Sequence, residues 1–420
     1  MDLNAKLDFN VVAVDQGETV HLLLEMEAPG LKGERRRDPA HLQVVLDRSG
    51  SMHGGSLVSA LQAIDSLIGR LHEDDLFGLV VFDNQVGVPV PAGPVGDGTA
   101  IRNVLHQIHP GGTTNLSGGL LRGIQECQRV SDGRSSTLVL LSDGHANVGI
   151  TDHGALADVA AGALKAGTSI STIGIGYGYD EDLLEAITRG GGGNSHFAEN
   201  GDEAGAQLAS EVDGLLEQVV QAASLLVKPS EQVSAVRLYN DMPVADVDGG
   251  FMVELGEFVA SEKRKLLFEI VVPDIATIGV AQVCEMELRW VDTESMESKV
   301  ATIPVDVNVI PGDQAAGRVK DTEVETELTF QQSQRSKREA ANALRDGDMA
   351  RARRLFRDSS ERLSSLDRAS RSERELFDVD DELAMIQRLQ SESEMDINMA
   401  RKRVHADFHK KSRRRGREDR

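Results

Sequence analysis

The sequence predicts an α/β fold in which a doubly wound, mostly parallel sheet is inserted into an antiparallel β-sandwich, followed by a C-terminal α-helical segment. Between residues 40 and 222, short apolar runs alternate with amphipathic helical patterns, which is typical of a parallel sheet covered by helices on both faces. Strand patterns occur on both sides of that region, in 1–37 and 224–310. Residues 320–420 are helical and highly charged.

The composition is that of a folded, acidic protein. The 420 residues hold 45 Lys and Arg against 68 Asp and Glu, a net charge of −23, and 40% of them are hydrophobic. Apolar runs fall short of the roughly 20 residues that a membrane helix needs, and the first residues do not resemble a secretory signal. Cys127 and Cys284 are too few for a disulfide framework. We therefore expect a cytoplasmic protein without a membrane span.

The N-terminal strands are expected at 9–14 and 19–26, with a turn between them and an exposed connection over 30–39. In the central region, apolar runs predict strands at 42–46, 76–82, 137–141, 169–175 and 195–198. Helical patterns lie between them at 56–71, 99–108, 117–130, 152–166, 180–189 and 202–222.

Strand patterns return at 233–239, 251–254, 265–272, 280–290 and 299–309, and Trp290 is expected in their core. These strands and the N-terminal pair are each too few to bury their faces alone. We therefore predict that they form one sandwich into which the central domain is inserted.

The last hundred residues predict a helical hairpin over 340–355, with a Gly-Asp turn, and then a longer helix over 375–410. Residues 401–420 hold ten Lys and Arg against three Asp and Glu. This basic tail therefore carries +7 and the rest of the chain −30. It is either a solvated terminus or a segment that binds an anionic partner such as nucleic acid, an acidic lipid surface or the chain's own acidic body.

Three oxygen-bearing side chains directly follow the apolar run 42–46. Asp47, Ser49 and Ser51 lie in a glycine-containing turn that leads into a helix. One carboxylate and two hydroxyls are hard ligands that suit Mg²⁺ or Mn²⁺. Alone, the pattern also fits a helix cap.

Two further segments strengthen the metal interpretation. Thr113 and Thr114 precede the helix expected at 117–130, and Asp143 follows the apolar strand 137–141. Ligands of doubly wound sheets bind beyond the carboxyl ends of the strands. The three loops meet there if their strands are neighbours.

These residues resemble the metal-ion-dependent adhesion site of the von Willebrand factor A family, whose pattern is Asp-x-Ser-x-Ser, then a Thr, then an Asp. The resemblance covers about residues 40–222 and implies a Rossmann-like domain. It also implies metal ligands at five positions, where Thr114 matches better than Thr113: Asp47, Ser49, Ser51, Thr114 and Asp143.

The resemblance implies binding and no enzyme activity. In the family, a Mg²⁺ ion is held by these groups, and an Asp or Glu of a partner protein completes its coordination. Intracellular bacterial relatives with flanking sandwich and helical segments often serve as scaffold subunits, so we expect a metal-dependent scaffold protein of a bacterial cytoplasm.

Two alternatives stay open. In the first alternative, the tail 401–420 tethers the protein to nucleic acid or an anionic membrane. The other is a metal-assisted hydrolase with Ser49 or Ser51 as nucleophile and Asp143 with His145 or His53 assisting, although the Gly-x-Ser-x-Gly pattern of many hydrolases is not matched there.

Overall fold

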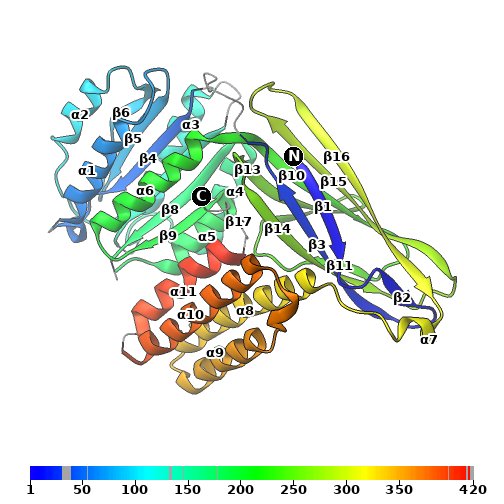
Figure 1. Cartoon of the computed structure of the whole chain (residues 1–420). Coiled ribbons are helices and arrows are strands. Elements are labelled where there is room, and N and C mark those ends of the chain that lie inside the picture. The colour runs from blue at the N-terminus through cyan, green and yellow to red at the C-terminus, as the bar shows by residue number, and fades with distance from the viewer. Residues whose placement is uncertain are drawn as a thin grey trace.

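A computed structural model of the chain describes residues 1–30, 39–53, 55–131, 135–144, 146–176, 178–395, 397–412 and 415–416. Figure 1 shows three parts: a sheet covered by helices, an elongated pair of sheets, and a group of helices that lies against both. The connection expected over 30–39 falls mostly on 31–38, outside the described residues.

The first part is built on a six-stranded sheet with the strand order β6-β5-β4-β7-β8-β9. Neighbouring strands are parallel except β5 and β6. Because β4 pairs with both β5 and β7, the strands that follow it in the sequence are added first on one side of β4 and then on the other. The strands are β4 (His41–Asp47), β5 (Leu76–Phe82), β6 (Val86–Pro94), β7 (Ser136–Ser142), β8 (Thr168–Ile175) and β9 (Gly192–Ala198).

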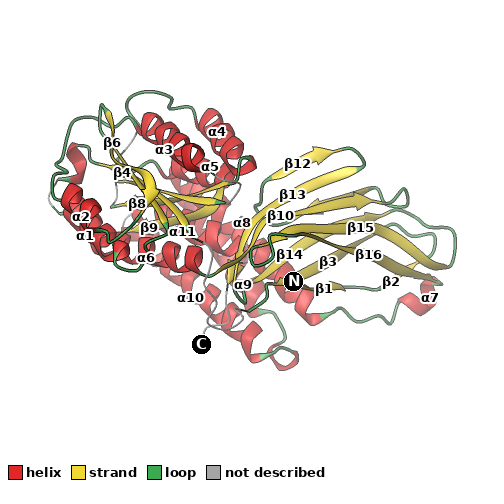
Figure 2. Cartoon of the chain, turned by 90° about the horizontal axis from the view of Figure 1, so that it is seen from above, coloured by secondary structure: helices red, strands yellow, loops and turns green. Residues whose placement is uncertain are grey.

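Helices cover both faces of this sheet (Figure 2). One apolar core joins the sheet to α1 (Ser56–Ile68), α2 (Thr99–Leu105) and α6 (Gly201–Leu216). A second core, on the other face, joins it to α3 (Leu116–Val130), α4 (His153–Lys165) and α5 (Glu181–Gly191). All residues of β4 and β7 are buried, as expected for central strands covered on both sides.

Two details of this domain differ from expectation. Strand β6 was not predicted, because Pro89, Pro91 and Pro94 interrupt its pattern, but it lies at the sheet edge, where proline is tolerated. The helix expected over 202–222 ends at Leu216, because the apolar residues that follow belong to the strand starting at Gln218.

The second part consists of two sheets that share one core. Their strand orders are β1-β3-β14-β11, with the short β17 beside β14, and β12-β13-β10-β15-β16-β2. Their neighbouring strands are antiparallel except β16 and β2. The strands are β1 (Asp2–Leu7), β2 (Val11–Ala13), β3 (Glu18–Glu27), β10 (Gln218–Pro229), β11 (Ala235–Leu238), β12 (Val244–Val247), β13 (Gly250–Val259), β14 (Lys263–Val272), β15 (Gly279–Asp292), β16 (Ser298–Ile310) and β17 (Arg415–Gly416).

The predicted fold class is confirmed. Leu24 and Phe268 from one sheet pack in the same core as Leu225, Met286 and Trp290 from the other. Strand β3 pairs with β14 along their whole lengths, so strands from before and after the helix-covered sheet complete one sandwich. Strands β1, β10 and β12 were not expected.

The third part is helical. Its elements are α7 (Gly312–Ala315), α8 (Thr322–Arg345), α9 (Met349–Ser364), α10 (Glu373–Met395) and α11 (Ile397–Ser412), with short 3₁₀ turns at Arg368–Ser370 and, in the first part, at Gly50–Met52. The hairpin turn is confirmed, with Gly347 at a φ of 77°. The single helix expected over 375–410 is wrong, because α10 ends and α11 packs back on α8. In the described part of the chain, every helix is too short or too polar to serve as a membrane span.

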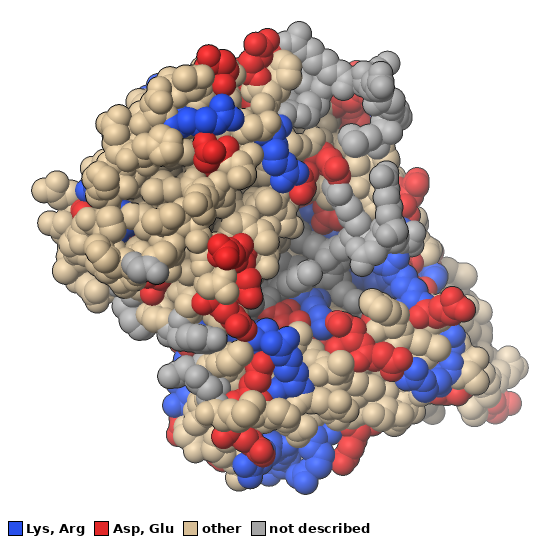
Figure 3. All heavy atoms as spheres, turned by 60° about the vertical axis from the view of Figure 1, so that its left-hand side comes forward, with Lys and Arg blue, Asp and Glu red and all other residues tan. Residues whose placement is uncertain are grey.

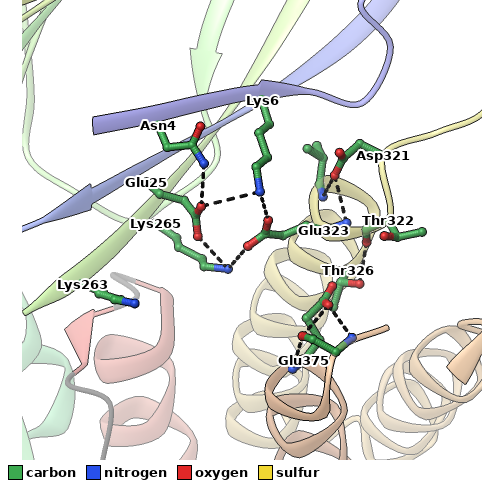
Figure 4. A network of polar contacts seen from close by, with 12 residues as sticks. Asn4, Lys6, Glu25, Lys263, Lys265, Asp321, Thr322, Glu323, Thr326 and Glu375 are labelled. Atoms are coloured by element: carbon green, nitrogen blue, oxygen red, sulfur yellow. Dashed lines mark hydrogen bonds and ion pairs between the residues drawn. The ribbon is translucent and has the colours of Figure 1, made fainter. Parts of the chain in front are cut away.

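Polar contacts fasten α8 to the sandwich (Figure 4). The Asp321 carboxylate caps the helix by accepting hydrogen bonds from the backbone N–H groups of its first turn. Glu323 in that turn pairs with Lys6 of β1 and, at 2.7 Å, with Lys265 of β14. Lys265 also pairs with Glu25 at 3.1 Å. The helical part is thereby held in a fixed position against the sandwich.

Candidate metal centre

The candidate centre begins with Asp47, the last residue of β4. Its carboxylate is fully buried and has two partners. Oδ1 accepts a hydrogen bond from the Ser49 N–H at 2.8 Å, and Oδ2 accepts one from the Ser142 hydroxyl at 2.7 Å. Because β4 and β7 are adjacent in the sheet, the Ser142 hydroxyl at the end of β7 orients the carboxylate at the end of β4.

The two serines extend the cluster towards solvent. Ser49 is buried and Ser51 is exposed, and their hydroxyl oxygens lie 3.0 Å apart. The Ser51 hydroxyl donates to Oδ1 of Asp143 at 2.7 Å. A continuous chain of hydrogen bonds therefore runs from the buried Asp47, through the Ser49 N–H and the two serine hydroxyls, to Asp143.

The loop before α3 supplies the threonine. Thr114 is buried, whereas Thr113 is exposed. The Thr114 carbonyl accepts hydrogen bonds from the N–H groups of Asn147 and Val148, which ties this loop to the one that follows Asp143. Asn115 caps α3 by accepting from the Gly118 N–H at 3.0 Å.

Gly144 shows how closely these groups converge. A methyl group on this residue would lie 3.3 Å from Thr114 Oγ1, 3.5 Å from Ser51 Oγ and 4.0 Å from Asp47 Oδ2. The missing side chain therefore leaves room beside oxygens from two different segments, the turn after β4 and the loop before α3. Together with the contacts above, the structure brings all five predicted site residues to one place at the carboxyl ends of β4 and β7.

The environment of the site disfavours the ionised forms of the Asp47 and Asp143 carboxylates. Burial raises the pKa of Asp47. Burial, together with the charge of Asp47, raises the pKa of Asp143 from 3.8 to about 6, against the opposing effect of the Ser51 hydrogen bond. Because burial of a charge without a counter-charge is unfavourable, a cation at this position would stabilise both carboxylates.

The donor set fits a hard divalent cation. It consists of carboxylate and hydroxyl oxygens, which suit Mg²⁺ and Mn²⁺ better than zinc. Within the described residues, no group of three His, Cys, Asp or Glu side chains could hold a metal ion. Any cation bound here would therefore depend on the hydroxyls of Ser49, Ser51 and Thr114.

Sequence reasoning missed two supporting residues. Ser142 orients Asp47 as described. Asp83 follows β5, and its Oδ2 lies 3.1 Å from Arg48 Nη2 and accepts a hydrogen bond from the Gly112 N–H at 3.4 Å. These contacts tie the Asp47 and Thr114 loops together. Both residues end or follow a buried strand of the same sheet, which is the signal that identified Asp143.

His53 is exposed, and His145 lies outside the described residues. The glycine run at 190–193 spans the end of α5 and the start of β9. Both cysteines are free and buried, and burial raises the pKa of each thiol to about 12.

The basic tail is largely engaged within the chain where it is described. Arg401 and Lys402 both pair with Glu181 of α5, at 2.6 and 2.9 Å. Arg403 pairs with Glu199 at 2.7 Å, and Lys411 pairs with carboxylates of α10. These four cations are thus neutralised by the chain's own acidic body, and residues 413–414 and 417–420 lie outside the described part.

Comparison with known proteins identifies the helix-covered sheet. A family model described as the von Willebrand factor type A domain matches residues 41–211. An uncharacterized protein from Synechocystis is 30% identical over 292 residues, which is 65% of this chain and 67% of that protein. The inter-alpha-trypsin inhibitor heavy chain H1 from Bos taurus is 28% identical over 200 residues, which is 45% of this chain and 22% of that protein. The chain thus spans about two thirds of the first relative and about a fifth of the second.

Solved structures share the architecture of the whole chain. The ArnB paralog VWA2 from Sulfolobus acidocaldarius has a TM-score of 0.63 at 17% identity, with 98% of each chain covered. A von Willebrand factor type A protein from Catenulispora acidiphila has a TM-score of 0.72 at 14% identity, with 99% of this chain and 97% of that chain covered. The sandwich and the helical part therefore belong to the shared fold.

Proposed function

The chain belongs to the von Willebrand factor type A family, whose domains commonly mediate interactions between proteins, and from this premise we propose that it binds a partner protein through a divalent cation. The cation is Mg²⁺, with Mn²⁺ as a substitute. The proposed ligands are Asp47, Ser49, Ser51, Thr114 and Asp143. The partner contributes the carboxylate of an Asp or Glu side chain.

The convergence of these side chains around Gly144 carries the proposal. Mg²⁺ usually retains several water ligands and exchanges one for an incoming oxygen ligand. Three of the five protein ligands are uncharged hydroxyls, so a bound cation would keep a strong attraction for an external carboxylate. This also gives an acidic protein a means of binding acidic partners.

The proposal is one of binding without turnover. The hydroxyls of Ser49 and Ser51 are hydrogen-bonded to each other and to Asp143. Among the described residues, neither hydroxyl is hydrogen-bonded to a histidine of the kind that activates a serine nucleophile. We further propose a scaffold role, and a location in a bacterial cytoplasm, because the two free, buried cysteines suit a reducing compartment. The tail is less favoured as a tether, because its described cations are paired within the chain.

Affinity capture from cell lysate tests the proposal. The parent and Asp47→Ala serve as baits, each in Mg²⁺ and in EDTA. An Asp248→Ala bait is the control, because it also removes one carboxylate but from an exposed turn of the sandwich. We expect a protein that is retained by the parent and by the control in Mg²⁺, and lost in EDTA and with Asp47→Ala. Identical retained sets under all conditions would contradict the proposal.

A further inference from the structure

The surface around the candidate metal centre is unusually poor in acidic side chains for so acidic a chain. Four of the loops that carry or contact the candidate ligands span 48–53, 83–85, 110–115 and 144–151, and a fifth, after β8, places Gly178 beside the backbone carbonyl of Asp143. Apart from the candidate ligands, the first four loops contain a single acidic residue, Asp83. Asp83 is buried and paired with Arg48. The carboxylates that border these loops, those of Asp152 and Asp180, cap α4 and α5 by accepting from the N–H groups of Ala155 and Leu183.

This charge distribution differs from that of the rest of the molecule. Figure 3 shows Lys, Arg, Asp and Glu side chains more densely on the helical part than on the visible face of the helix-covered sheet domain above it. In a chain with 68 Asp and Glu, exposed carboxylates beside the centre would repel an acidic partner. Their scarcity on the four loops favours an approaching carboxylate.

Apolar side chains occupy one side of the same surface. Val148 and Ile150 follow Asp143 and are 40% and 39% exposed, and Leu121 of α3 is 37% exposed. The Val148 N–H donates to the carbonyl of Thr114 at 3.2 Å. The Ile150 N–H donates to the Ser117 hydroxyl at 2.9 Å, and Leu121 lies one helical turn after Ser117, on the same side of α3.

These backbone contacts hold the apolar side chains at a fixed position relative to Thr114. Exposed apolar groups that border a polar site commonly mark an interaction surface. Here they adjoin loops from which exposed carboxylates are nearly excluded. With the cation bound, this surface would therefore present a strongly electrophilic metal ion beside a patch of apolar side chains.

We propose that Val148, Ile150 and Leu121 form an apolar subsite beside the metal centre, and that the partner is a protein segment in which an Asp or Glu lies next to a large apolar side chain. This inference rests on the proposed function. The carboxylate binds the cation and the apolar side chain packs against Ile150 and its neighbours. A segment with further acidic residues in place of the apolar one binds less tightly.

A peptide array tests the inference. Nine-residue peptides carry one central Glu, and each flanking position is varied among apolar, small, polar and acidic residues. The full-length parent, Ile150→Ser and Val280→Ser are applied in Mg²⁺ and in EDTA. Val280 is 77% exposed on the sandwich strand β15, so it is a matched control for removal of a surface apolar side chain. Calorimetric titration of Mg²⁺ into each protein is measured separately.

We expect the Mg²⁺-dependent signal to be strongest where Leu, Ile, Val or Phe lies within about three residues of the Glu, a span of roughly 10 Å. Ile150→Ser should weaken binding of these peptides roughly fivefold while it leaves the Mg²⁺ affinity unchanged, and Val280→Ser should alter neither.

Two results would overturn the subsite while leaving Mg²⁺ binding at the centre intact. One is equal Mg²⁺-dependent binding of serine-flanked and leucine-flanked peptides. The other is normal Mg²⁺ binding without a metal-dependent signal from any peptide. Failure of the parent to bind Mg²⁺ would instead refute the proposed function itself, and the subsite with it.

Discussion

Replacement of Asp143 by Asn should have opposite effects on stability with and without metal. Asn keeps an oxygen that accepts the hydrogen bond from the Ser51 hydroxyl, which lies 2.7 Å from Asp143 Oδ1. It removes the negative charge that burial and Asp47 make unfavourable. In EDTA at pH 7.5 we therefore expect the variant to be more stable than the parent.

The magnitude follows from the pKa of Asp143, which rises from 3.8 to about 6 on folding. Because the folded state holds this proton more tightly than the unfolded chain, the stability of the metal-free parent falls as the pH rises from about 4 to about 6. The shift corresponds to about 3 kcal/mol, and solvent near the site reduces it to about 1–2 kcal/mol. For a domain of this size, the expected gain in Tm is about 2–8 °C.

Thermal unfolding measured in EDTA and in excess Mg²⁺ checks this prediction. At a Mg²⁺ concentration of about 100 times Kd, the parent should gain about 2.7 kcal/mol, and Asp143→Asn should gain little. The order of stability would then reverse between the two buffers. A variant that is less stable than the parent in EDTA and equally stabilised by Mg²⁺ would refute the reasoning.

Three further predictions concern groups that support the site and the fold. Ser142→Ala removes the hydroxyl that donates to Asp47 and should weaken Mg²⁺ binding about tenfold or more, as measured by calorimetry; an unchanged affinity would count against the orienting role. Lys402→Met removes a buried ammonium that pairs with Glu181. This variant should destabilise the docking of α11 by about 1–3 kcal/mol and speed amide hydrogen exchange over 397–412. Unchanged exchange over these residues would contradict the prediction. Burial opposes ionisation of Glu211, but His196 and hydrogen-bond donors around it lower its pKa from 4.5 to about 2. The parent should therefore be more stable than Glu211→Gln at pH 7 and should lose this advantage as the pH falls from about 4.5 towards 2. Urea unfolding across that range measures the difference, and a difference that does not change with pH would contradict the prediction.

The sequence allowed prediction of those parts of the fold that depend on local patterns. The apolar runs of β4 and β7 identified central strands, because residues covered on both faces are uniformly apolar. The hairpin at Gly347 followed from its turn residues. Strand β6 escaped because its prolines are tolerated only through its position at the sheet edge, which is a property of the tertiary structure.

The same contrast holds for the site. Asp47, Ser49, Ser51, Thr114 and Asp143 were found by their order and by their positions after apolar runs. Their convergence around Gly144 depends on the adjacency of β4 and β7. Asp83 and Ser142 could not be assigned a role from sequence, because their function lies in contacts between loops that are distant along the chain. The break between α10 and α11 was likewise invisible in a continuous helical pattern.

Mg²⁺ titration of Thr114→Val and Thr113→Val, with the parent beside them, tests the central claim most directly. Valine has nearly the shape of threonine but lacks the hydroxyl, so each variant removes one oxygen. Thr114 is buried beside Gly144, and Thr113 is exposed. We predict one Mg²⁺ ion per chain for the parent and Thr113→Val, and loss of binding for Thr114→Val. Equal Mg²⁺ affinity in all three proteins would contradict the account.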